Sequence, residues 1–165
     1  MLLVTCAVGA CAMAVGCRAY QIGSPSMYRP DVRSVNVAVF ESDSYRKFLG
    51  QRFTEAVVKQ IELNTSFQLA DEATADSFLR GRIVRDTKSV KIETIDDDPR
   101  DLAVGLQLEV TWTDRAGLPL MPRQVLRLNR SIDFIPEGGQ SLAVVQQELI
   151  NLISRQIVQQ MEMPW

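Results

Sequence analysis

Residues 102–112 alternate without exception between large apolar side chains and polar or small ones. The positions in the apolar phase are Leu102, Val104, Leu106, Leu108, Val110 and Trp112. Because successive side chains of a β-strand point to opposite faces, this pattern predicts a strand with one buried face and one open face. A strand of this kind is not stable alone, so the chain must supply neighbouring strands and a second layer that covers the apolar face.

Further extended segments surround this strand. Asp114 to Gly117 form a turn, with glycine where a left-handed backbone is favoured, and a return strand is predicted over 126–134. Upstream, the run "ADSFLRGRIVRDTKSVKIE" places Leu79, Gly81 and Ile83 on one face of a strand, and shorter strands are predicted over 35–40 and 67–70. The acidic stretch 96–101 lacks the ligand order of a calcium-binding loop and is predicted to be a solvated hairpin loop.

Two segments repeat apolar residues at helical spacing. The first, 46–63, follows a polar break in which Asp43 or Ser44 is expected to cap the helix. The second, 142–161, carries mostly glutamine on its polar face, which suits either solvent or a polar enclosure. The elements follow in the order strand, helix, strand, strand, strand, helix. This order predicts an α+β two-layer sandwich, in which both helices cover one face of a mixed, roughly four-stranded sheet. The first strand–helix–strand unit is expected to be parallel.

The first sixteen residues contain no charged side chain and resemble the apolar region of a secretory signal. They end in Ala14-Val15-Gly16, directly before Cys17, as in the cleavage site of a bacterial lipoprotein. We therefore predict a signal peptide over 1–16, lipid attachment at Cys17, a tether over 17–31 and a folded domain over 32–165. A secretory signal usually begins with Lys or Arg, and the absence of both counts against a lipoprotein signal. One alternative is an ordinary cleaved signal, with Cys17 as a plain thiol. The other is lipid attachment at Cys11.

The composition restricts the chemistry that the chain can perform. Histidine is absent, which excludes Ser-His-Asp and Cys-His catalytic sites and zinc sites that contain histidine. The 18 basic and 20 acidic residues nearly balance, so a general nucleic-acid binder is not indicated. Two of the 3 cysteines lie within the predicted signal, which leaves no pair for a disulfide in the mature chain. No catalytic residue, cofactor site or metal site is predicted.

These features together resemble the LptE family of lipopolysaccharide-assembly lipoproteins. The resemblance begins with the lipidated cysteine followed by an aromatic residue and a glycine, here Cys17, Tyr20 and Gly23. It continues with the strand and polar break "VNVAVFESDS", the helix "FTEAVVKQI", the hairpin "VTWTDRAGLPL" and a closing helix that ends near Trp165. The most diagnostic part is the motif Ala-Asp-x-x-Leu-x-Gly-x-Ile, which is "ADSFLRGRI" here. The chain departs from the family in having Arg18-Ala19 before the tyrosine, which concerns the tether.

The resemblance implies a non-enzymatic role. A protein of this family sits largely inside the LptD outer-membrane β-barrel, helps the barrel to assemble, and contacts lipopolysaccharide as it is delivered to the outer leaflet. It implies attachment to the outer membrane on the periplasmic side; Arg18 is not the aspartate that retains such lipoproteins in the inner membrane. The alternative is a free-standing envelope lipoprotein that binds another periplasmic or cell-wall partner.

Arginines are expected on the sheet face that points away from the helices. Alternation places Arg80, Arg82 and Arg127 together there if their strands are neighbours. One interpretation is a solvated basic face that protects exposed strands. The other is a site for glycolipid phosphates, because several guanidinium groups on a rigid surface bind an anion that one would hold weakly. On the opposite face, Gly81 is predicted to be structural, since a side chain there would meet a covering helix.

Overall fold

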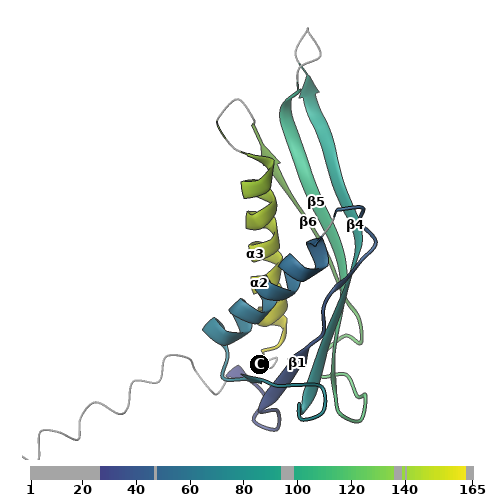
Figure 1. The fold of residues 1–165 in the computed structure, drawn as a ribbon, viewed down its shortest axis with the longest axis vertical. Coiled ribbons are helices and arrows are strands. Elements are labelled where there is room, and N and C mark those ends of the chain that lie inside the picture. Colours follow the sequence, from purple (N-terminus) through teal and green to yellow (C-terminus); the bar gives the residue numbers. More distant parts are fainter. Residues whose placement is uncertain (1–26, 47, 94–98, 136–138, 140, 163–165) are drawn as a thin grey trace, which may run out of the picture.

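A computed structural model describes residues 27–46, 48–93, 99–135, 139 and 141–162 of the chain. Figure 1 shows two helices packed against one side of a long, twisted sheet, so the predicted two-layer α+β arrangement is confirmed. In chain order the elements are β1 (Ser34–Val37), β2 (Glu41–Ser42), α2 (Leu49–Asn64), β3 (Gln68–Leu69), β4 (Ser77–Glu93), β5 (Pro99–Asp114), β6 (Leu126–Phe134) and α3 (Leu142–Gln160).

The sheet has six strands rather than about four, because two short pieces also pair. Its order is β3-β1-β4-β5-β6, and β2 pairs with β4 beside this path. β1 lies parallel to both β3 and β4, as the first strand–helix–strand unit requires, whereas β4, β5 and β6 form an antiparallel meander. The segment expected to be only a polar break contains β2, which pairs in parallel with the middle of β4.

The start of the first long helix differs from the prediction. The residue that precedes α2 is Phe48, which adopts a left-handed conformation with φ of 62° and makes no capping hydrogen bond through its side chain. Asp43 and Ser44 do not cap the helix. The Ser44 hydroxyl instead donates to Asp86 of β4 and accepts a hydrogen bond from the backbone N–H of Arg46. The segment before α2 is therefore tied to the sheet rather than to the helix.

The core lies between the helices and the apolar face of the sheet. Every position in the apolar phase of residues 102–112 is buried, as are the predicted helix positions Phe53, Ile61, Leu149 and Ile153. Gly81 also faces this core, but a Cβ atom there would meet the ring of Phe40, whose Cζ would lie 2.7 Å away, rather than a helix. Phe40 is itself packed against Phe53 of α2, with ring centroids 5.0 Å apart.

Polar bonds join the start of β4 to β1 and β5. The Asp76 carboxylate accepts hydrogen bonds from the backbone N–H groups of Arg33 and Ser34 and from the Ser34 hydroxyl. These bonds, above all the one from the Ser34 hydroxyl, hold the pKa of Asp76 below its ordinary value. Trp112 donates its indole N–H to the buried Ser77 hydroxyl at 3.1 Å, and Ser77 donates to the Ser34 carbonyl. The first residues of the "ADSFLRGRI" motif thus fasten three strands together.

A register shift interrupts the alternation of β4. Ile83 pairs with Leu108 and Arg85 pairs with Gln107, so the backbone bulges around Val84. Beyond the bulge Asp86 lies opposite Leu106, on the core side, and its side chain is only 4% exposed. The Arg46 guanidinium compensates this buried charge through an ion pair of 2.8 Å, and the Ser44 hydroxyl supplies a second contact.

Candidate functional site

The sheet face opposite the helices carries Arg80, Arg82 and Arg127, all exposed. Arg80 and Arg82 stand on β4 and Arg127 stands on β6, so β5 separates the two strands. The three arginines therefore share one face, although they do not come from neighbouring strands. We call this surface the outer sheet face; its central residues are Arg80, Arg82, Gln107, Glu109, Thr111 and Arg127.

Register explains how the arginines are placed around one carboxylate. Arg82 of β4 and Arg127 of β6 both lie directly opposite Glu109 of β5. With strands about 4.8 Å apart, the two arginines are roughly 10 Å from one another at their backbones. Arg127 donates to Glu109 at 3.0 Å. Arg82 turns the other way and donates to both oxygens of Asp43, which follows β2.

The arginines of this face differ in how tightly carboxylates hold them. Hydrogen bonding and the negative charge of Asp43 raise the pKa of Arg82 above its ordinary value. Arg80 is held more loosely: its guanidinium lies 3.6 Å from Glu72, and both side chains are mostly exposed. It also lies over the ring of Phe78, 5.8 Å from the ring centroid, which is the geometry of a weak cation–π contact. The outer sheet face is therefore a mixed-charge surface rather than a purely basic one.

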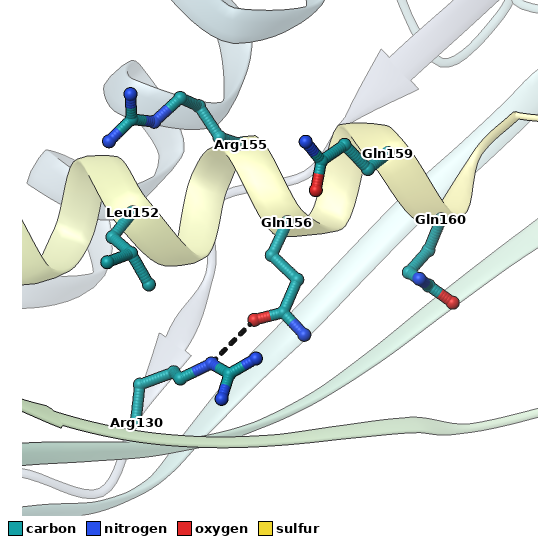
Figure 2. A pocket seen from close by; sticks show the side chains of 6 residues that line it. All are labelled: Arg130, Leu152, Arg155, Gln156, Gln159 and Gln160. Atoms are coloured by element: carbon teal, nitrogen blue, oxygen red, sulfur yellow. Dashed lines mark hydrogen bonds between the residues drawn. The ribbon is translucent and has the colours of Figure 1, made fainter.

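A second polar surface lies where α3 passes over β6. Two adjoining hollows of about 520 and 270 Å³ share Gln156 and Gln160 as lining residues. Figure 2 shows Gln156 reaching from α3 toward Arg130 of β6, which donates to the glutamine oxygen at 2.8 Å, while Arg155 points to the other side of the helix. We call this surface the β6–α3 groove; its main lining residues are Met121, Arg123, Leu126, Arg130, Leu152, Gln156 and Gln160.

Sequence reasoning did not identify this groove, although one signal pointed to it. Arg130 falls in the same phase of β6 as Leu128 and Ile132, which point toward the helical layer, and it lies opposite Leu106 of β5. A charged residue at a core-phase position needs a polar partner or an open edge. Arg130 has both, because Gln156 accepts its hydrogen bond and β6 is the last strand of the sheet.

Several predicted features fall outside the described residues. The signal 1–16, Cys17 and Cys11 all belong to the part of the chain for which no structure is described, as do residues 96–98 of the acidic stretch. The rest of that stretch, 99–101, is not the predicted loop but forms the start of β5, where it pairs with the end of β4. Within the described part, no helix has the length and apolarity needed to cross a membrane. The same residues contain no group of three or more acidic, cysteine or histidine side chains arranged to hold a metal ion.

The fold is that of an α+β domain in which the helical layer covers one face of the sheet. The other face of the sheet is polar, exposed and crossed by ion pairs. Comparison of the sequence with family models then gives the identity of the group. The model of the LptE family, described as lipopolysaccharide-assembly, matches residues 32–163, and the chain belongs to this family. The resemblance read from the motifs is thereby confirmed. The family is one of envelope lipoproteins with an assembly role rather than an enzymatic one.

Solved structures agree with this fold. A crystal structure from Xanthomonas campestris aligns with a TM-score of 0.59 and 10% identity, covering 85% of this chain and 89% of the other. The solution structure of lipoprotein B from Nitrosomonas europaea aligns with a TM-score of 0.52 and 12% identity, covering 84% and 90% of the two chains. Rare lipoprotein B from Shewanella oneidensis is 17% identical, with a TM-score of 0.49 and coverages of 76% and 92%. No curated protein sequence matches the chain.

Proposed function

We propose that the protein is the plug and assembly subunit of a lipopolysaccharide translocon. In this role it binds an LptD-type outer-membrane β-barrel and aids insertion of lipopolysaccharide into the outer leaflet. The observation that carries the proposal is the match to the lipopolysaccharide-assembly family over residues 32–163. Large barrels enclose a polar lumen, and an outer sheet face covered with paired charges is compatible with such surroundings.

The anchor of the proposed subunit is a lipid on Cys17, held in the outer membrane on the periplasmic side. Each buried methylene contributes about 0.8 kcal/mol, and a single acyl chain binds only marginally, so a cysteine with several chains gives stable attachment. Described structure begins at Met27, so the intervening residues connect the proposed anchor to the domain. We expect the protein to fractionate with outer-membrane markers on a sucrose gradient, and fractionation with inner-membrane markers would contradict this placement.

For contact with lipopolysaccharide we propose the arginines of the outer sheet face. Each guanidinium already has a carboxylate neighbour, so a phosphate must replace or share that neighbour. Arg80 is the most easily released for such an exchange, because its 3.6 Å contact with Glu72 is the longest of the three and Glu72 is 78% exposed. Arg82 and Arg127 flank Glu109 and would contribute charge on either side of it. Arginine binds phosphate in the same forked geometry in which it binds carboxylate, so the exchange keeps its hydrogen bonds satisfied.

The translocon role is tested by purification from detergent-solubilised outer membranes. The tagged full chain is expected to co-purify with the LptD-type barrel of the same cell and to disappear from the membrane when that barrel is depleted. Stable membrane levels after depletion, together with recovery of another periplasmic or cell-wall protein, would instead favour the free-standing lipoprotein.

The arginine site is tested separately by binding of the chain without residues 1–17 to lipopolysaccharide at low and high salt. The variant Arg80→Ser/Arg82→Ser/Arg127→Ser should lose most of the salt-sensitive binding while its thermal unfolding stays close to that of the parent. A matched control, Arg29→Ser/Arg33→Ser/Lys59→Ser, removes the same charge away from the outer sheet face and should bind like the parent. Equal binding by both variants would show that the outer sheet face is only a solvated surface.

A further inference from the structure

β6 is the terminal strand of the sheet and is long enough to bind another strand. It spans Leu126–Phe134 and pairs with β5 on one side, while no strand of the described chain lies on its other side. Asn129 and Ser131 in its centre are exposed. An edge strand presents a row of backbone N–H and C=O groups that an extended peptide can pair with, so β6 offers main-chain hydrogen bonds to a partner.

The groove beside this edge has a positive lining. Arg123 and Arg130 line it near β6, whereas no aspartate or glutamate is among its lining residues. Arg127 also lines it but is paired with Glu109 of the outer sheet face, and Arg155 points to the other side of α3. Arg130 is bonded to Gln156, which is neutral, so its charge is not cancelled there. Among the described residues, Arg123 and Arg130 take part in no ion pair within 4.0 Å, in contrast to the three arginines of the outer sheet face.

The remaining lining residues suit a polypeptide. Gln156 and Gln160 face the groove from α3, and an amide side chain both donates to a carbonyl and accepts from an N–H group. Figure 2 shows Leu152, Gln156 and Gln160 directed from α3 toward the β6 side, so the helix offers both apolar and polar contacts to the groove. A peptide strand beside β6 would place alternate side chains against this lining.

We propose that the β6–α3 groove and the free edge of β6 together dock an extended, acidic segment of a partner polypeptide. The segment adds to the sheet as a strand next to β6, and its carboxylates bind Arg123 and Arg130. Charge complementarity selects an acidic partner, and the adjacent open strand favours a polypeptide over a glycolipid, which has no row of main-chain groups to pair with β6. This inference holds for any partner protein and does not depend on glycolipid binding by the outer sheet face.

The test is photo-crosslinking in cells that produce the full lipidated chain. A photo-reactive phenylalanine derivative is placed at Asn129 or Ser131 on the free edge, and control probes are placed at Thr111 in the centre of the sheet and at Lys59 on α2. The edge probes are expected to give a discrete crosslink to a polypeptide segment of net negative charge, mapped by mass spectrometry, and the control probes are not. Arg123→Glu/Arg130→Glu should lower the yield of this crosslink by about tenfold or more, because like charges repel in the groove.

The matched control, Lys59→Glu/Arg85→Glu, makes the same change of charge elsewhere and should leave the yield unchanged. Four results would each overturn the inference: loss of the crosslink in both variants, a crosslink to glycolipid instead of polypeptide, a crosslink to a neutral or basic segment, or no crosslink at the edge. The absence of any crosslink at the edge would show that the arginines only shield it against aggregation. A crosslink to an acidic segment of a protein other than an LptD-type barrel would support the inference and count against the proposed translocon role.

Discussion

Replacing Gly81 tests the packing of β4 against the segment that follows β1. A Cβ atom at this position would overlap the ring of Phe40, lying 2.7 Å from Cζ. The ring has little room to move, because Phe40 is only 2% exposed and packs against Phe53 of α2. Both Gly81→Ala and Gly81→Val must therefore displace Phe40 or separate β4 from α2.

The cost follows from the two ways in which the structure can respond. Overpacking a core typically costs about 1–3 kcal/mol. Complete loss of a buried phenylalanine costs about 3–5 kcal/mol, which is an upper limit for a displaced Phe40 ring. We expect Gly81→Ala to destabilise by about 2 kcal/mol and Gly81→Val by about 4 kcal/mol. At roughly 3–4 °C per kcal/mol for a domain of this size, the alanine variant should unfold about 6–8 °C lower.

The assay is thermal and urea unfolding of the chain without residues 1–17, followed by circular dichroism. Gly105→Ala is the matched control. It lies on β5 but points to the outer sheet face, where the added Cβ meets the hydroxyl of Thr87, an exposed side chain that can change rotamer, and it should change stability by less than about 1 kcal/mol. If Phe40 is the obstacle, Gly81→Ala should cost much less in a Phe40→Leu background, as neighbouring sites are not additive. An unchanged Tm for Gly81→Ala, or strict additivity with Phe40→Leu, would refute the reasoning.

Three further changes are expected to separate structural from functional residues. Asp76→Ala should lower stability at neutral pH. Hydrogen bonds lower the folded-state pKa of Asp76 below the ordinary 3.8, so the stabilisation by its carboxylate is present above that pH and is lost as the pH falls below it. The parent and the variant should therefore converge in urea titrations at low pH, and a difference that persists there would contradict the assignment. Arg46→Gln leaves the carboxylate of Asp86 buried without its cation and should lower the free energy of unfolding by about 3 kcal/mol. The double variant Arg46→Gln/Asp86→Leu should recover most of that stability. Unfolding curves that show no recovery would exclude a charge effect. Cys17→Ser should abolish labelling by a radioactive fatty acid, and labelling that persists would move the anchor to another residue.

Much of the fold follows from the sequence, because its strongest patterns are long and regular. The alternation over 102–112 identifies the buried face of β5, and the alternation of β6 and of the first part of β4 identifies which of their faces is buried as well. The helical spacing in α2 and α3 identifies the buried positions Leu49, Phe53 and Ile153 correctly. In each case the same face is buried over many residues, so a shift by one residue would expose the whole apolar set.

The misplaced features depend on single residues. One bulge at Val84 shifts the alternation of β4, so that Asp86 lies on the core side, and nothing in the local pattern marks that change. The start of α2 could not be located because Phe48 in a left-handed conformation replaces an ordinary polar cap. The β2 strand is only two residues long and owes its conformation to pairing with β4, a long-range contact that local propensity does not encode.

The fixed positions of the most diagnostic motif of the family are structural in this chain. Ala75, Leu79 and Ile83 are fully buried, Asp76 is bonded to the start of β1, and Gly81 makes room for Phe40. A match at these fixed positions therefore identifies the fold, and none of their side chains is free to bind a ligand. Arg80 and Arg82, which lie within the motif but in the opposite phase, are the exception, since their side chains leave the core at the outer sheet face. We therefore expect binding at the outer sheet face and in the β6–α3 groove, where side chains can change without disturbing the bonds that hold β1, β4 and β5 together.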